Sequence, residues 1–218
     1  MKTFGRMALA CGMVALITVP ASAQQGRGGW GFGGGGAALL SNKGVQKELK
    51  ANDEQAEKLN TLAREMMGKQ REESQGLRDL SQEERREKMQ ELARTHNAEL
   101  VKGMGGFLKP EQVKRFEQIQ LQQSGVAAFA SPRVQEALKL TDEQKSKFRE
   151  ISDASGESMR EAFQGAQSDR EGAMRKIGEV RKQATEKAVG VLTDDQKKAW
   201  KDMTGEPFQV VYEPRPQN

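Results

Sequence analysis

The sequence predicts an all-α protein made of two tandem helical-hairpin units, each with long antiparallel helices flanked by short helices. Three observations predict this fold: a helix-start motif that occurs four times, an internal duplication, and apolar residues spaced at the helical period. An extended, Gly-rich tether is expected before the units, and an extended, Pro-containing tail after them.

The motif Leu-Thr-Asp-Glu-Gln at residues 140–144 returns as Leu-Thr-Asp-Asp-Gln at residues 192–196, and degraded copies lie at residues 51–55 and 108–112. In each clean copy the threonine hydroxyl can accept a hydrogen bond from the glutamine N–H, while the glutamine amide reaches back to the threonine N–H. Each copy therefore predicts a helix start and carries no chemistry of its own. The expected motif helix caps are Leu140, Thr141, Gln144, Leu192, Thr193 and Gln196.

The chain is internally duplicated. Residues 45–50 (Val-Gln-Lys-Glu-Leu-Lys) align with residues 134–139 (Val-Gln-Glu-Ala-Leu-Lys) at an offset of 89, and the motif copies then align without a gap. Later landmarks agree at slightly smaller offsets. The alignment predicts a first unit at residues 39–125 and a second at residues 131–205, joined by a linker at residues 126–130.

The first residues have the form of an export signal. Lys2 and Arg6 precede an apolar run at residues 7–19, and the Ala-Ser-Ala sequence ending at Ala23 is typical of a signal peptidase site. Cleavage near Ala23 would leave a periplasmic or secreted protein and would remove Cys11, the one cysteine, so neither a disulfide nor a reactive thiolate is expected. No later apolar run is long enough to predict a transmembrane span.

Composition indicates thin cores. Removing Lys2 and Arg6 lowers the 35 basic residues to 33 against 31 acidic ones, a net charge of +2, which does not imply a nucleic-acid partner. Charged residues make up 30%, aromatic residues 5%, and the mean hydropathy is −0.78, values typical of long exposed helices. Residues 24–38 are expected to be a flexible Gly-rich segment. Prolines in residues 206–218 predict an extended tail, which can lie along the bundle.

The expected elements follow in order. A short helix at residues 39–49 precedes a first hairpin whose turn lies near residues 79–81, and a short helix at 111–124 follows it. The second unit repeats this order, with a short helix at 132–138 capped by Ser131, a hairpin turning near residues 167–168 and a short helix at 194–203. Ser-x-x-Glu capping boxes at Ser81 and Ser168 should open the second helix of each hairpin.

Apolar stripes should hold each hairpin together. The first stripe comprises Leu59, Leu62, Met66, Leu77, Met89, Leu92, His96, Leu100 and Met104, and the second comprises Phe148, Ile151, Ser155, Met159, Ala162, Phe163, Met174, Ile177, Ala184, Ala188 and Val191.

The sequence contains no constellation typical of an enzyme. One histidine, no cysteine after cleavage and no phosphate-binding glycine loop leave nothing for acid–base or nucleophilic chemistry, and no cofactor is expected. His96 lies on the apolar stripe beside methionines, a set that a soft metal can use. We interpret it as a core or interface histidine and expect no metal site.

The two clean Leu-Thr-x-x-Gln copies, the signal sequence and the Glu-Glu-Arg-Arg run at residues 83–86 resemble the Spy and CpxP group of periplasmic stress proteins. The resemblance covers residues 39–205. It implies an all-helical, cradle-shaped fold and ATP-independent chaperoning, or binding to the sensor domain of an envelope stress kinase. The chain departs from the group by carrying two motif pairs, which predicts a monomer that acts as a fused pseudo-dimer.

A basic, Met-containing helical surface is compatible with binding of non-native or partner proteins. Its candidate residues are Arg85, Arg86, Met89, Arg94, Met159, Arg160, Arg170, Met174, Arg175, Lys176, Arg181 and Lys182. The same residues can equally form an ordinary solvated helix face. Two other functions remain open: a metal-responsive or signalling regulator of the envelope, and a purely structural envelope protein.

Overall fold

The structure is a computed structural model that describes residues 35–77, 79–165 and 169–211. The described residues contain no strand, which confirms the predicted all-α fold. The elements in order are α1 (Gly36–Leu40), α2 (Lys43–Glu48), α3 (Asp53–Gly76), α4 (Gln82–Gly105), α5 (Pro110–Ser124), the 3-10 helix η1 (Gly125–Ala130), α6 (Pro132–Ala137), α7 (Asp142–Gly165), α8 (Arg170–Val191) and α9 (Asp194–Thr204). The expected signal sequence at residues 1–23 lies outside the described residues, as do residues 24–34 and 212–218.

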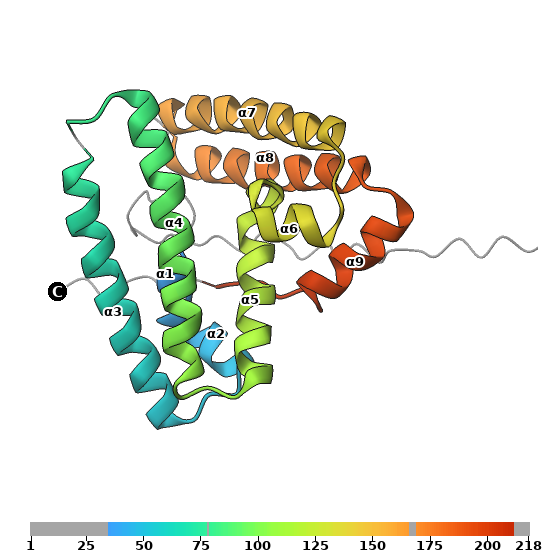
Figure 1. The fold of residues 1–218 in the computed structure, drawn as a ribbon. Helices are drawn as coiled ribbons and strands as arrows, with labels where there is room; N and C mark the ends of the chain where they lie inside the picture. Colours follow the sequence, from blue (N-terminus) through green and yellow to red (C-terminus); the bar gives the residue numbers. More distant parts are fainter. Residues whose placement is uncertain (1–34, 78, 166–168, 212–218) are drawn as a thin grey trace, which may run out of the picture.

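The helices form two groups (Figure 1). The long helices α3 and α4 run beside α5, whereas the α7–α8 hairpin lies across their direction. The two groups meet through α5, which contacts both η1 and α9. Within the described residues, no helix combines the length and apolarity needed to cross a membrane.

Side-chain caps open the helices as the motif predicts. Asn52, Ser81, Thr141 and Thr193 each accept a hydrogen bond from the backbone N–H three residues later and complete a capping box. Ser131 occupies the N-cap position before Pro132 as expected, but its side chain makes no capping hydrogen bond. The helix α8 is capped by Asp169, whose carboxylate accepts from the Gly172 N–H, while Ser168 lies outside the described residues.

The helix expected at residues 39–49 is two helices. Asn42 is the reason for the break, since its side chain accepts the Val45 N–H at 3.0 Å and caps α2, while its backbone is extended. The helix α1 begins at Gly36, so it includes residues 36–38, which were expected to belong to the Gly-rich segment. Ala37 is buried. Residues 36–38 are therefore part of the folded first unit.

Each unit has its own hydrophobic core, and equivalent positions fill both. Leu40, Leu59 and Phe116 are fully buried in the first. At the duplicated positions Phe129, Phe148 and Trp200 fill the second. The Phe129 ring stacks on Phe148 with 4.3 Å between ring centroids, and it lies 4.5 Å from the Trp200 ring at a tilt of 32°. Aromatic rings in one core thus replace mostly aliphatic side chains in the other.

The predicted apolar stripes are buried over only part of their length. Leu59, Met66, Leu77, Leu100 and Met104 are buried as expected. The interior position expected for Met89 is wrong, since 57% of it is exposed, and Met174 is 52% exposed on α8. Met89 is exposed because no core residues cover its part of α4. The first core, which includes residues of α1 and α5, contacts α3 and α4 only at residues 59–66 and 100–104.

The segments expected to be a linker and a tail both contribute to the cores. Residues 126–130 form most of η1, and Phe129 is buried in the second core. Residues 206–211 form no helix, as predicted, and Phe208 and Val210 pack against the first core. Each core is therefore completed by chain that follows the last helix of the other unit.

Candidate functional site

The four motif glutamines form two side-chain pairs, which we call the Gln clasps. In the second unit Gln144 and Gln196 exchange hydrogen bonds, with Gln144 Nε2 donating to Gln196 Oε1 at 2.7 Å and Gln196 Nε2 returning a bond at 3.0 Å. Each amide also donates to a carbonyl of a distant segment, Val191 O at 3.1 Å and Leu138 O at 3.1 Å. The clasp joins the starts of α7 and α9.

The first unit has the equivalent clasp despite its degraded motifs. Gln55 and Gln112 exchange bonds of 3.2 and 3.3 Å, and their amides donate to Phe107 O at 3.0 Å and Leu49 O at 2.8 Å. Gln112 is buried, so its polar atoms depend on these partners. The glutamines of both degraded copies therefore make the same kinds of contact as those of the clean copies, although the threonine is missing from both.

The chain before each clasp repeats in detail. Lys50 and Lys139 have positive φ angles of 52° and 50°, and both precede the motif by the same number of residues. Gln46 donates to Leu40 O at 2.7 Å, and its equivalent Gln135 donates to Phe129 O at 3.0 Å. No buried side-chain polar atom of the described residues lacks a partner. The motif thus holds the fold together, and its hydrogen-bonding groups are already engaged with protein.

Exposed methionines mark a different surface. Among the described residues, the large hydrophobic side chains that are exposed are Met67, Met89, Met174 and Val211, at 39%, 57%, 52% and 53%. The three methionines lie on the hairpin helices α3, α4 and α8. Met159, expected with them, is half-buried, because it is four residues after buried Ser155 and three before buried Ala162 on the inner face of α7.

Four of the predicted cations on α8, Arg175, Lys176, Arg181 and Lys182, are exposed but do not share one face. Met174 and Arg181 are seven residues apart and lie on the same side of the helix, as do Arg175 and Lys182 on a neighbouring side. Lys176 lies on the other flank, where its Nζ is 3.8 Å from Glu161 Oε2 of α7. Arg175 and Arg181 are therefore the cations beside Met174, while Lys182 Nζ is 4.0 Å from Glu186 Oε1 on the same helix.

The remaining predicted site residues are spread over both units. Arg94 and Arg160 are exposed on α4 and α7. Arg85 donates to Leu77 O and Leu80 O, both at 3.0 Å, so its guanidinium holds the turn between α3 and α4. The side chains of Arg86 and Arg170 lie outside the described residues. The most extensive element contacts between the units run through α5, η1 and α9.

His96 lies in a polar cluster between α3 and α4. Its Nε2 contacts Glu73 Oε2, and Lys69 Nζ binds Glu99 Oε1 at 2.6 Å one turn away. The hydrogen bond from Lys69 lowers the pKa of Glu99, and the same bond to Glu99 raises the pKa of Lys69. Across the described part of the chain, no three His, Cys, Asp or Glu side chains are grouped to hold a metal ion.

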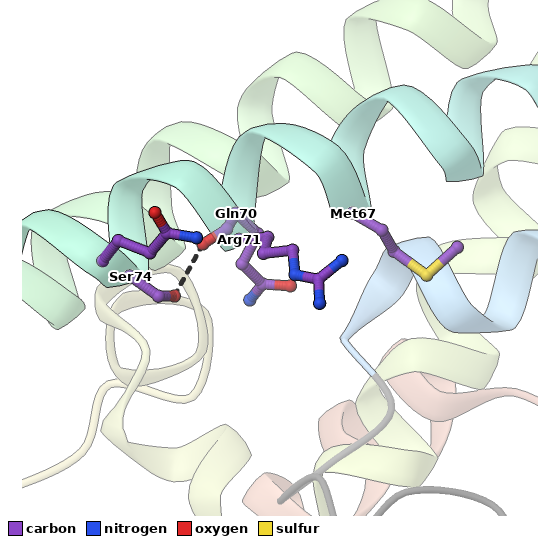
Figure 2. A pocket seen from close by; sticks show the side chains of 5 residues that line it. Met67, Gln70, Arg71 and Ser74 are labelled. Carbon is purple, nitrogen blue, oxygen red and sulfur yellow. Dashed lines mark hydrogen bonds between the residues drawn. The ribbon is translucent and has the colours of Figure 1, made fainter.

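Two shallow depressions flank α3. One, of about 440 Å³, is lined by Met67, Gln70, Arg71, Ser74 and Gln75. Figure 2 shows these side chains on the same side of α3, with the Ser74 hydroxyl donating to Gln70 O at 2.6 Å. The other, of about 510 Å³, lies between α3 and the end of α4; Leu62 and Phe107 contribute apolar surface, and Glu54, Glu57 and Glu65 contribute carboxylates.

Sequence reasoning identified the glutamines as caps but missed their pairing. The sequence did contain a signal for this pairing, because each unit carries two motif copies with glutamine at the same position. A comparison of the chain with family models, with curated proteins and with solved structures finds no match.

Proposed function

We propose that this protein is an exported, ATP-independent chaperone-like protein that holds non-native or partner proteins on the surface of its long hairpins. The observation that carries the proposal is the exposure of Met67, Met89 and Met174, three of the four large hydrophobic side chains exposed among the described residues. A methionine side chain is unbranched and polarizable, so it adapts to apolar partners of many shapes.

Charge supports the same function. Exposed Arg175, Arg181 and Lys182 lie on α8 with Met174, so a client would meet cations beside an apolar contact. Such cations favour acidic clients and accelerate their encounter, while the methionine contributes apolar contact that is independent of sequence. The resemblance of the motif copies and the signal sequence to the Spy and CpxP group supports export to the envelope and a stress-related role.

The test is suppression of aggregation of an unrelated denatured protein by the chain from Gln24 onward, without nucleotide. We expect the light scattering of the client to fall at a severalfold molar excess of the protein. The double variant Met89→Gln/Met174→Gln should lose most of this effect, because it removes the exposed apolar contacts at nearly constant side-chain length.

The matched control is Val211→Thr, which changes an equally exposed apolar residue outside the hairpins. It should suppress aggregation as well as the parent does. No suppression by the parent protein would reject the chaperone function and favour a structural or regulatory role in the envelope. Equal suppression by the double variant and the parent would mean that clients bind to a surface other than the one around Met89 and Met174.

We also propose that the chain acts as a monomer equivalent to a fused dimer. The support is the contact of α5 with α9, the helices that follow the two hairpins and are equivalent in the duplication. Such a contact between equivalent elements is what a twofold dimer interface provides. Sedimentation equilibrium of the chain from Gln24 onward should give the monomer mass, and an obligate dimer would contradict the proposal.

A further inference from the structure

The chain that follows α9 turns back onto the first unit. We call residues 206–211 the strap. Gly205 has a φ of 63° and a ψ of −159°, a backbone conformation that side-chain-bearing residues rarely adopt, and a Cβ there would also force the Gln118 side-chain amide on α5 to move. The turn directs the strap along α5 and towards α2.

Side chains of the first unit form hydrogen bonds with main-chain atoms of the strap. Gln122 on α5 accepts the Phe208 N–H at 2.8 Å through Oε1 and donates through Nε2 to Glu206 O at 2.8 Å. Arg115 donates to the same Glu206 carbonyl at 2.9 Å. Asn42 donates to Val211 O at 2.7 Å, close to the end of the described strap. These bonds require an extended backbone and do not depend on side-chain identity.

Two alternate side chains supply the apolar part of the contact. Phe208 and Val210 pack on the first core, while Gln209 and Val211 between and after them are exposed. A Cβ built on Gly44 would lie 3.9 Å from Phe208 Cζ, which places the ring against α2. The strap therefore lies against α2 and α5, on a contact surface that we call the strap site, with an aromatic residue two positions before a β-branched one.

We propose that the strap site is a binding site for extended peptide segments that carry an aromatic residue two positions before a β-branched residue, and that the strap is its resident occupant. Polar groups of the strap site recognise main-chain atoms that every extended peptide presents, and the two apolar positions select the side chains. Phe208 and Val210 are only half-buried, so the strap can be exchanged for a similar segment.

The strap competes with peptides in solution for this site. The strap is attached directly to α9, and a short attachment gives it an effective concentration on the order of millimolar. A peptide in solution therefore binds well only after the strap is weakened. This site is separate from the methionine surface and does not depend on the proposed client-holding function.

The test uses a fluorescent peptide with the sequence of residues 204–211, Thr-Gly-Glu-Pro-Phe-Gln-Val-Val, and the chain from Gln24 onward. The strap-weakened variant is Phe208→Ser/Val210→Ser. We expect fluorescence anisotropy to show at least about tenfold tighter binding to this variant than to the parent. A matched peptide with serine in place of its phenylalanine should not bind.

Adding Gln122→Ala to the strap-weakened variant should reduce affinity at least about tenfold, since it removes three main-chain hydrogen bonds, with Thr204 O, Glu206 O and the Phe208 N–H. Equal affinity for the parent and the strap-weakened chain, or no effect of Gln122→Ala, would overturn the proposal. Hydrogen exchange of the Phe208 amide in the parent protein is an independent readout that does not rely on the variants folding. Millimolar peptide should accelerate it and the serine peptide should not; unchanged exchange would also overturn the proposal.

Discussion

Replacing Gln144 by alanine should destabilise the protein more than replacing its capping partner Thr141. Gln144 makes four hydrogen bonds: its Oε1 accepts from Thr141 N at 3.1 Å and from Gln196 Nε2 at 3.0 Å, and its Nε2 donates to Val191 O at 3.1 Å and to Gln196 Oε1 at 2.7 Å. Thr141 contributes one side-chain bond, to the Gln144 N–H at 3.2 Å.

The magnitudes follow from these bonds. A hydrogen bond contributes about 1 kcal/mol net, and Gln144 is half-buried, so water replaces part of what is lost and Gln144→Ala should cost about 2 to 3 kcal/mol. Thr141→Ala should cost about 1 kcal/mol. Alanine has the higher helix propensity, so the loss at Gln144 cannot come from the helix itself.

Urea unfolding of the single and double variants provides the assay. Gln144 and Gln196 share two bonds, so the double-mutant cycle should show a coupling energy of about 1 to 2 kcal/mol. Gln183→Ala on the exposed side of α8 is the control and should change stability by less than about 0.5 kcal/mol. A Gln144→Ala cost no larger than that of Thr141→Ala, with no coupling to Gln196, would refute the clasp.

Three further outcomes are expected. Lys50→Gly and Lys139→Gly should each raise the urea midpoint, corresponding to about 0.5 to 1 kcal/mol, because both residues have positive φ angles that glycine adopts without strain. Gly205→Ala should lower the melting temperature, whereas Gly178→Ala, at a helical position with nothing within 4 Å of the new Cβ, should raise it. Hydrogen bonds from the side chain and backbone of the capping serine lower the pKa of Glu84. Its contribution is therefore present above the ordinary glutamate pKa of about 4.3 and is lost as pH falls through the lower folded value, so the stability advantage of the parent over Glu84→Gln should disappear in acid.

Local sequence signals predicted the helix starts. A capping box depends on residues three apart, so Ser81 and Thr193 could be assigned without knowing the tertiary fold. The break before α2 was not predicted, because the apolar spacing there is continuous with that of one longer helix. Asn42 caps α2 within this stretch. Helical period gives the face on which a residue lies, but it does not give the length of helix that other elements cover. The period therefore assigned Met89 to the apolar stripe, but its exposure agrees with its other expected place, on the candidate binding surface.

Contacts between segments that are distant in the sequence could not be predicted from it. The Gln55–Gln112 bond joins residues 57 apart, and the bond of Gln122 to the Phe208 N–H joins residues 86 apart. Neither spacing corresponds to a secondary-structure period, so periodicity cannot reveal them. The candidate cations were found as residue types, but Arg85 is engaged in a turn, a role that depends on where the carbonyls of Leu77 and Leu80 lie.

The two hairpins differ in what holds their helices together, although the units share an origin in one duplicated sequence. Along α7 and α8, small buried side chains such as Ala162, Ala173 and Ala184 let the helices pack closely over their length. In α3 and α4, the half beyond the core is bridged by polar pairs, Lys69 with Glu99 and Glu73 with His96. Local opening costs least where few apolar contacts are buried. Met67 and Met89 lie in that half, so the first hairpin provides the adaptable part of the proposed client surface and the second provides its rigid part.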